Sequence, residues 1–582
     1  MQSPPSPRRR GRALRLLLLL ALAAAALLAF LTSTPAQHYA SSVSSSSPAR
    51  ALLVPPPRTS SSSSNSKRLT LRAVREATST PAYHGDPPDA VLLPDWEVLV
   101  LLRPGAPAPP GGNATCAFPG GAASPARSLG RMPASGRRAY TCDMPRPERR
   151  HKPFRAPRLI ATSMTSSDDQ SSESQSTPPL MLLRWSGRLV YDAVALHSTG
   201  DVLVLAKGVN PRQGVNRNAS DVRCVYYRDN NNATGSVVAS LPASTSAQQV
   251  FRCPPPPTTT TDDLRVTLAV ADGEPIPSMA TYSPPSPTPT DEKNKKVAVC
   301  ACTMVRDVAK FLREWVAYHA AVGVDRFFLY DNGSQDDLEG QVRQLNSAGF
   351  HVSTHLWPWP KTQEAGFSYA AAVHRDSCEW MAFVDVDEFI FSPSWAPSSK
   401  PTKSMLRSIV AAVEPDVGQV TLGCKDFGPS GQTKHPEEGV TQGYTCRRRA
   451  EERHKSLVRL DAVDPSLINS IHHFELRPEL RWERSQQARV NHYKYQAWDE
   501  FKVKFRRRVS TYVADWTDPV NHGSKDRTPG LGFEAVEPAG WAHKFCDVED
   551  TLLRDVTRGW FGVGFSSNKL RRLGPPTHYS SS

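Results

Sequence analysis

Three carboxylates follow a strongly apolar stretch in the segment from Met381 to Phe391, which reads Met-Ala-Phe-Val-Asp-Val-Asp-Glu-Phe-Ile-Phe. Carboxylates at the end of a buried strand are costly unless a metal ion or a cationic side chain meets them. Because side chains alternate along an extended chain, Asp385 and Asp387 should point to the same side. Oxygen ligands of this kind suit Mn²⁺ or Mg²⁺, which also bind diphosphates. The segment therefore predicts a metal and diphosphate site, against the plainer alternative of a strand entering a solvated loop.

The elements around this segment predict a mostly parallel sheet. Apolar runs indicate strands at Val297–Thr303, Arg326–Tyr330, Phe350–Leu356 and Met381–Val384. Helical spacing indicates helices over 308–322, 336–345 and 364–378, with Gly323 ending the first. Such alternation is typical of crossover-connected parallel strands, whose ligands bind at the carboxyl ends of the strands. Asp331 and the Asp385/Asp387 pair both follow strands, so we expect them at one edge of the sheet.

The N-terminus predicts a membrane anchor. Arginines from Arg8 to Arg15 precede an apolar run that ends at Leu31. Positive charge before the run keeps that side cytoplasmic. We therefore expect a cytoplasmic tail at 1–12 and a transmembrane signal anchor at 13–31, giving a single-pass type II protein whose mass is lumenal. A cleaved signal peptide and a plastid transit peptide are the alternatives.

Sequons and cysteines agree with a lumenal address. Asn-x-Ser/Thr sequons occur at Asn113, Asn218, Asn232 and Asn332, and the last is expected to be occluded. Cys116 with Cys142, and Cys224 with Cys253, are candidate disulfides, whereas Cys300 and Cys302 are expected to be free thiols on a buried strand. The net charge of +14 would suit nucleic acid, but a membrane-anchored chain with sequons makes that partner unlikely, and we predict no nucleic-acid binding.

Composition divides the rest of the chain. Residues 32–89 are rich in Ser and Pro and predict a disordered stem. Short apolar runs separated by turn residues predict a small all-β domain at 90–275, followed by a linker at 276–295. The α/β domain is expected at 296–565, with a C-terminal tail at 566–582.

Several blocks in order carry a family resemblance. They are Cys-Thr-Met-Val-Arg-Asp at 302–307, Glu-Trp-Val-Ala-Tyr-His at 314–319, Tyr-Asp-Asn-Gly-Ser at 330–334, Phe-Val-Asp-Val-Asp-Glu-Phe at 383–389, Phe-Gly-Pro-Ser-Gly at 427–431 and Val-Asn-His-Tyr-Lys-Tyr at 490–495. These blocks resemble glycosyltransferase family 92, and in particular its plant branch, which includes the pectic β-1,4-galactan synthases. The resemblance covers about 295–560. In that branch the all-β domain would correspond to a carbohydrate-binding module.

The resemblance implies a GT-A-like catalytic domain, which is a Rossmann-type mixed α/β sheet, and an inverting transferase that uses UDP-galactose and Mn²⁺. The residues that would bind the donor are Thr303, Arg306, Asp331, Asn332 and Asp385. The metal ligands would be Asp385, Asp387 and His492, with His472 and His473 as alternatives for the histidine. Glu388 is expected to support the site or to pair with an arginine. Trp357 and Trp359 could stack on a sugar or pack in the core.

The general base of an inverting transfer is left open among Asp426, Asp499 and Glu500. A helix beginning near Trp498 is expected to carry Lys502, Lys504 and the arginines at 506–508 on one side, where one cation could neutralise a diphosphate.

The leading hypothesis is a Golgi galactosyltransferase acting on a cell-wall polysaccharide such as pectic β-1,4-galactan, with a homodimer left open. One alternative is a glycan-binding or degenerate transferase without activity. Another is a haloacid-dehalogenase-type phosphatase, which places Asp-x-Asp on its first strand rather than after several strands.

Overall fold

The computed structural model describes residues 88–109, 114–161, 181–211, 214–228, 236–258, 261, 263–271, 273–285, 296–504 and 537–565. Among these residues, no helix is long and apolar enough to cross a membrane. The predicted anchor at 13–31 lies outside the described residues, as do the sequons at Asn113 and Asn232 and all of the predicted stem at 32–89 but its last two residues, of which Asp89 begins the first strand.

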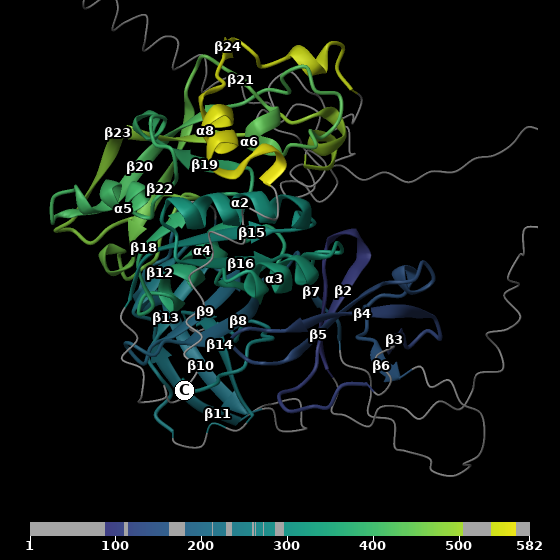
Figure 1. Cartoon of the computed structure of the whole chain (residues 1–582). Coiled ribbons are helices and arrows are strands. Elements are labelled where there is room, and N and C mark those ends of the chain that lie inside the picture. Colours follow the sequence, from purple (N-terminus) through teal and green to yellow (C-terminus); the bar gives the residue numbers. More distant parts are fainter. Residues whose placement is uncertain are drawn as a thin grey trace, which may run out of the picture. The chain divides into compact units, whose positions relative to one another are not determined.

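Residues 88–285, called the β region below, form three sheets (Figure 1). A seven-stranded sheet has the order β6-β3-β4-β5-β2-β1-β7. Its strands are β1 (Asp89–Leu92), β2 (Glu97–Leu101), β3 (Ala114–Ala117), β4 (Ala123–Arg131), β5 (Arg138–Asp143), β6 (Arg158–Ala161) and β7 (Leu183–Arg184). The second sheet has β12 (Thr245–Ala247), β13 (Val250–Cys253), β9 (Val202–Lys207) and β8 (Leu189–Ala195), in that order. The third has β11 (Ser236–Pro242), β10 (Val222–Arg228) and β14 (Leu264–Val270).

Two disulfides hold the β region, one within its seven-stranded sheet and one between its other two sheets. Cys116 of β3 bonds to Cys142 of β5, and Cys224 of β10 bonds to Cys253 of β13. Both predicted pairs are therefore present. Residues 276–282, which the composition assigns to a linker, also pack here: Ile276 and Met279 are buried, and Tyr282 N–H donates to Leu264 O.

Residues 296–565, called the α/β region below, are built on an eight-stranded mixed sheet with the order β17-β16-β15-β18-β22-β20-β23-β19. The strands are β15 (Val297–Val305), β16 (Arg326–Asp331), β17 (Val352–Leu356), β18 (Cys378–Phe383), β19 (Glu388–Phe391), β20 (Val417–Asp426), β22 (Glu452–Arg459) and β23 (Arg481–His492), beside a small β21 (Cys446–Arg447) and β24 (Val548–Glu549) pair. The helices are α2 (Ala309–Val322), α3 (Leu338–Ser347), α4 (Gln363–Val373), α5 (Ser404–Ala411), α6 (Val440–Gly443) and α8 (Leu552–Phe561). In Figure 1, α6 and α8 lie side by side.

The predicted parallel half of this sheet is confirmed. Strands β15, β16, β17 and β18 pair in parallel, with crossover helices between them. Helix α2 ends where Gly323 adopts a φ of 138°, and an added Cβ there would collide with Lys403 O. The helix predicted over 364–378 is shorter, because β18 already begins at Cys378. Cys300, expected to be a free thiol, is bonded to Cys378 across β15 and β18, whereas Cys302 is free and buried as predicted.

The β region and the α/β region share one hydrophobic core. A single cluster contains Leu99 and Trp185 from the first and Tyr330 and Trp359 from the second. The rings of Trp185 and Trp359 stack with centroids 5.8 Å apart, so the tryptophans at 357 and 359 are core residues rather than a sugar platform. Burial of this shared apolar surface is a main source of stability for the contact between the β region and the α/β region.

Asp192 on β8 is a buried carboxylate within this shared core. Its Oδ1 accepts from Ala193 N–H at 2.9 Å and its Oδ2 accepts from Trp359 Nε1–H at 3.4 Å. Burial raises the pKa of Asp192 to about 6, although these bonds and Arg137 oppose the rise. The folded state thus holds this proton more tightly than the unfolded chain does. The contribution of Asp192 to stability is therefore greatest near pH 4 and falls as the pH rises towards 6.

Replacing Asp192 by asparagine should remove this dependence. Above pH 6 we expect Asp192→Asn to be more stable than the wild type by up to about 3 kcal/mol, with little difference near pH 4. Urea unfolding of both proteins near pH 4.5 and pH 7.5 measures the effect. Equal differences at the two pH values would contradict the assignment.

Candidate functional site

Asp385 and Asp387 lie in the turn between β18 and β19, at the edge where β15 and β16 also end. This placement at the carboxyl ends of parallel strands agrees with the sequence prediction. The expectation that both point to one side rested on an extended chain, and these residues are not extended. A bond from Glu388 N–H to Asp385 O, 3.0 Å long, closes a turn, and the alternation of an extended strand ends before it. The two carboxylates therefore meet different partners.

Asp385 belongs to a buried cluster centred on Lys455 of β22. The Lys455 Nζ lies 3.2 Å from Asp385 Oδ2 and 2.7 Å from Glu388 Oε1. It also lies 2.8 Å from Nε2 of His472, whose Nδ1 bonds to Phe383 O. Burial alone would raise the pKa of Asp385, but Lys455 outweighs it and the pKa is lowered. Glu388 thus pairs with a lysine, not with an arginine, and accepts from Asp385 N–H at 2.9 Å.

His472 is buried beside this lysine. Burial and the neighbouring ammonium lower the pKa of His472 to about 3, so its imidazole is neutral. Its Nε2 lies 3.6 Å from Asp385 Oδ2. His473, the next residue, instead contacts His454 and Gln419. Of these two candidate histidines, His472 is the one that approaches an Asp-x-Asp carboxylate among the described residues.

Asp387 belongs to a second cluster, centred on His492 at the end of β23. His492 Nε2 lies 3.5 Å from Asp387 Oδ2, and its Nδ1 lies 2.9 Å from Asp426 Oδ1. The other Asp426 oxygen accepts from Lys494 Nζ at 2.8 Å. Burial disfavours the charged imidazole, but Glu388 and Asp387 raise the pKa of His492 to about 9. Burial likewise opposes ionisation of Asp426, yet His492 and Lys494 hold its pKa well below the usual value.

Lys504 places an ammonium directly against Asp387 Oδ2. It comes from the helical residues 498–504, and the predicted continuation beyond 504 lies outside the described residues. Burial would raise the pKa of Asp387, but Lys504 and His492 depress it strongly. The sequence had singled out Lys504 as one of several cations, and the structure brings this one to the carboxylates.

Asp387 and His492 are the side chains that fit a divalent ion best. A carboxylate oxygen and an imidazole nitrogen suit Mn²⁺, and the bond from Nδ1 to Asp426 leaves Nε2 available as the ligand. Among the described residues, no group of three or more His, Cys, Asp or Glu side chains is arranged to hold a metal ion. An ion here would take few protein ligands and complete its coordination with phosphate oxygens, a common arrangement for Mg²⁺.

The loop after β16 adjoins the same edge of the sheet. Asp331 Oδ1 accepts from Ser334 N–H at 2.8 Å, and the Asn332 amide donates to Trp357 O at 2.8 Å. Burial raises the pKa of Asp331. Thr303 is fully buried at the end of β15, whereas Arg306 lines a small cavity beside Asn332. Of the predicted donor residues, Arg306 and Asn332 thus face one space, while Thr303 sits in the core.

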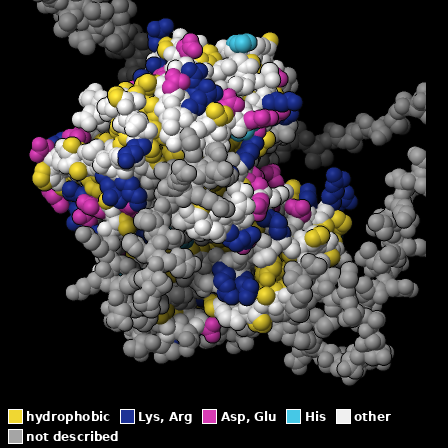
Figure 2. All heavy atoms as spheres, in the orientation of Figure 1, with side chains coloured by type: hydrophobic (Ala, Val, Ile, Leu, Met, Phe, Trp, Pro, Cys, Tyr) yellow, Lys and Arg dark blue, Asp and Glu magenta, His cyan; other side chains and the backbone are white. Residues whose placement is uncertain are grey.

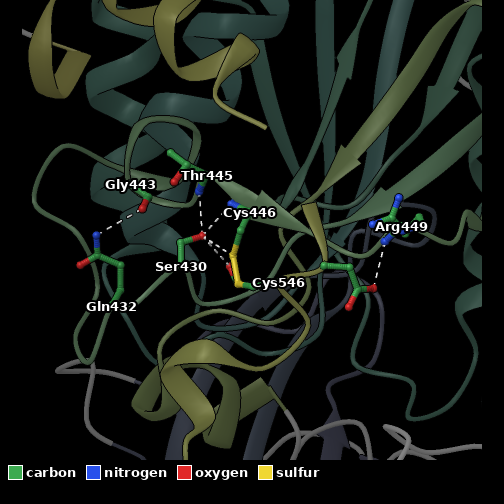
Figure 3. The surroundings of a disulfide bond; sticks show 9 residues. Ser430, Gln432, Gly443, Thr445, Cys446, Arg449 and Cys546 are labelled. Atoms are coloured by element: carbon green, nitrogen blue, oxygen red, sulfur yellow. Dashed lines mark hydrogen bonds between the residues drawn. A yellow bond between two sulfur atoms is a disulfide. The ribbon is translucent and has the colours of Figure 1, made fainter. Parts of the chain in front are cut away.

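A second loop, Phe427 to Gly431, follows Asp426 and packs between the segment at Thr445 and Cys446 and the segment at Lys544. Figure 3 shows Ser430 Oγ accepting from the N–H groups of Thr445 and Cys446, next to the disulfide between Cys446 and Cys546. A Cβ at Gly428 would lie 2.7 Å from Lys544 O, so only glycine fits this crossing. The loop is therefore a rigid support behind Asp426 and His492.

The other base candidates lie at the start of the helix that carries Lys504. Asp499 is exposed, and Glu500 forms an ion pair with Lys310 at 2.5 Å. In the described part of the chain, neither forms an ion pair with the cations that hold Asp385 and Asp387. On the face that Figure 2 shows, basic side chains are scattered among acidic ones, which does not favour a nucleic-acid surface.

Comparison with known proteins finds a family model and relatives that all carry the same family description. The model of glycosyltransferase family 92 matches residues 295–522. A glycosyltransferase family 92 protein of Oryza sativa subsp. japonica is 39% identical over 495 residues, which is 81% of this chain and 80% of that protein. A Ricinus communis protein of the same description is 42% identical over 392 residues, covering 65% of this chain and 67% of its own. An Arabidopsis thaliana one is 40% identical over 385 residues, covering 64% and 66%.

Solved structures are more distant. A mannosyltransferase from Pyrobaculum calidifontis in complex with GDP-Man and Mn²⁺ is 10% identical, with a TM-score of 0.22 over 47% of this chain and 73% of that one. Glucosyl-3-phosphoglycerate synthase from Mycobacterium tuberculosis, with Mn²⁺ and UDP, is 12% identical, with a TM-score of 0.16 over 29% and 58%. Scores this low do not bear on fold or function.

Proposed function

The chain belongs to glycosyltransferase family 92, and on that premise we propose that it is an inverting, metal-dependent hexosyltransferase. Membership in the family makes it a glycosyltransferase and removes the phosphatase alternative. The donor, the metal and the acceptor are parts of the proposal. The mixed sheet, with its four parallel strands, fits a GT-A-like domain.

One observation carries the proposal. Asp387, His492 and Asp426 form a chain of contacts, with 3.5 Å from Asp387 to His492 and 2.9 Å from His492 to Asp426, at the sheet edge where β16 delivers Asp331. A carboxylate that orients a histidine is the usual support of a metal ligand. Asp331, 54 positions earlier than Asp385 along the chain, lies at the same edge and suits the nucleoside end of a donor.

The roles of the side chains follow from their contacts. Asp387 and His492 would hold Mn²⁺, which when bound stabilises the negative charge on the departing nucleoside diphosphate. Lys504 adds a second positive charge beside the same place. Asp385 is held by Lys455 and would assist from beside the metal ligands. Asp426 has both oxygens engaged, so it positions His492, and the base is left to Asp499 or Glu500.

The identities of the donor and the acceptor are supported by the resemblance to the plant branch of the family. We propose UDP-galactose as donor and a cell-wall glycan such as pectic β-1,4-galactan as acceptor. The β region would help to bind that polysaccharide. The basic residues followed by an apolar run before Leu31 support a type II protein of the Golgi membrane.

A donor panel tests the proposal. The lumenal protein, from residue 32 onwards, is incubated with UDP-galactose, UDP-glucose and GDP-mannose, with Mn²⁺ or with EDTA, and release of the nucleoside diphosphate is measured. We expect turnover of UDP-galactose with Mn²⁺ and a loss of at least about 100-fold with EDTA. Galactan oligomers then serve as acceptors. Turnover that EDTA leaves unchanged would rule out the metal-dependent mechanism.

A further inference from the structure

We propose that the β region completes the nucleoside site of the donor, with Arg127 as its contact residue. The inference rests on the proposed function, because it assigns an additional wall to the same donor site. It concerns the small cavity that Arg306 and Asn332 line. Residues from both regions of the chain surround it: Leu93, Glu97, Leu99, Arg127, Leu129 and Thr141 from the β region, and Arg306, Asn332, Gly333, Pro358 and Pro360 from the α/β region.

The wall from the β region is one face of its seven-stranded sheet. Arg127 of β4 pairs in register with Thr141 of β5, and Thr141 pairs with Leu99 of β2. Leu129 and Glu97 each lie two residues from a member of this row. Because side chains two residues apart share a face, Glu97, Leu99, Thr141 and Arg127 line the same side of the sheet, and Leu129 reaches the cavity from a bulge in β4. The row therefore results from strand pairing and not from one mobile loop.

Arg127 reaches the donor loop directly. Its Nη1–H donates to Ser334 O at 3.4 Å, across 207 positions of sequence. Gly333, with a φ of 80°, lies beside it too, since a Cβ there would be 4.0 Å from Arg127 Nη2. Ser334 is also the residue whose N–H donates to Asp331 Oδ1. Arg127 thus holds the loop that presents Asp331, the carboxylate expected to contact the nucleoside.

The chemistry of the cavity suits the edge of a nucleoside. Its walls combine apolar surfaces from leucines and prolines with polar side chains. On the β side these include the Glu97 carboxylate, which accepts from Thr141 Oγ1–H at 2.6 Å, beside the cationic Arg127. The carboxylates Asp385 and Asp387, where a diphosphate is expected, follow β18, which lies two strands from β16 in the sheet, and they do not line this space.

The cavity is small compared with a nucleoside. Its volume of about 30 Å³ holds a water molecule or two, not a whole nucleoside. Arg127 therefore contacts the outer edge of the base or ribose at the rim, while the remainder of the donor lies towards Asp331. Such a contact gives a charge-assisted hydrogen bond to a carbonyl or hydroxyl oxygen.

Binding of UDP and of inorganic pyrophosphate, each with Mn²⁺, tests the assignment in the lumenal protein from residue 32 onwards. We expect Arg127→Ala to weaken UDP binding about 10-fold and to leave pyrophosphate binding unchanged, because only UDP carries a nucleoside. The control is Arg131→Ala on the same strand, where Arg131 donates to Gly136 O at 2.9 Å and is exposed. It should bind both ligands as the wild type does.

Three outcomes separate the possibilities. UDP binding by Arg127→Ala equal to the wild type overturns the inference and leaves the proposed function standing. Equal weakening of UDP and pyrophosphate also overturns it, since the loop as a whole would then be disturbed. A wild type that binds neither ligand overturns the proposed function and this inference with it. If Arg127→Ala melts at a lower temperature, Arg127→Met, which keeps the length of the side chain but removes its charge, replaces it in the same comparison.

Discussion

Asp387→Asn is expected to lower kcat/KM for donor turnover by at least about 1,000-fold, a loss of about 4 kcal/mol of transition-state stabilisation. The amide keeps the shape of the side chain but removes the negative charge that faces Lys504 and His492. With it goes the carboxylate ligand that would hold a divalent ion against the diphosphate. Donor hydrolysis or transfer with Mn²⁺, measured for the purified protein from residue 32 onwards, gives the value.

Two further variants make this result specific. Asp426→Asn should have a smaller effect, about 10- to 100-fold, because Asp426 acts only through His492. Asp461→Asn, an exposed carboxylate that pairs with Arg459 at 3.0 Å, should remain near the wild type. If Asp387→Asn stays within 10-fold of the wild type while folded, Asp387 has no role in holding the metal.

Lys455→Met should cost about 3–5 kcal/mol of stability, since removing one partner of a buried ion pair strands the other. Lys455 is 7% exposed, and it neutralises both Glu388, which is fully buried, and Asp385. The Lys455→Met and Glu388→Met double variant should regain much of this loss, because only the half-buried Asp385 then lacks its cation. Urea unfolding at pH 7 of both single variants and the double variant gives the coupling energy.

A surface lysine supplies the control. Lys403 lies 3.4 Å from Asp325 and is 59% exposed, so Lys403→Met should change the free energy of unfolding by less than about 1 kcal/mol. A Lys455→Met protein within about 1 kcal/mol of the wild type would show that the cluster is not a stabilising ion pair. A double variant as unstable as the single one would show that Glu388 is not the group left stranded.

Much of the architecture could be read along the chain, because it depends on local patterns. The parallel strands from Val297 to Phe383 and helix α2 follow from apolar periodicity and from the stop at Gly323. Asp331, Asp385 and Asp387 follow from acids placed directly after such strands. The two disulfides of the β region join cysteines 26 and 29 positions apart, close enough to be paired within one region of composition.

Local sequence patterns did not predict the contacts that the site residues make with segments far away in the chain. Lys455 meets Asp385 from 70 positions away, and Lys504 meets Asp387 from 117. Cys300 finds Cys378 only because β15 lies beside β18, and Arg127 meets Ser334 only because the β region packs against the donor loop. Sequence carries the residue types for these contacts but no sign of which pairs will meet.

The sequence alone therefore established the class of fold, the acidic edge of the sheet and the resemblance to a transferase family. These depend on the order of apolar and charged residues, which local physics can interpret. Tertiary structure decided that Asp385 and Asp387 have separate cations, that Asp426 orients His492, and that the β region shares a core with the α/β region. Strand register and burial set those contacts, and both arise only when segments far apart in the chain are brought together.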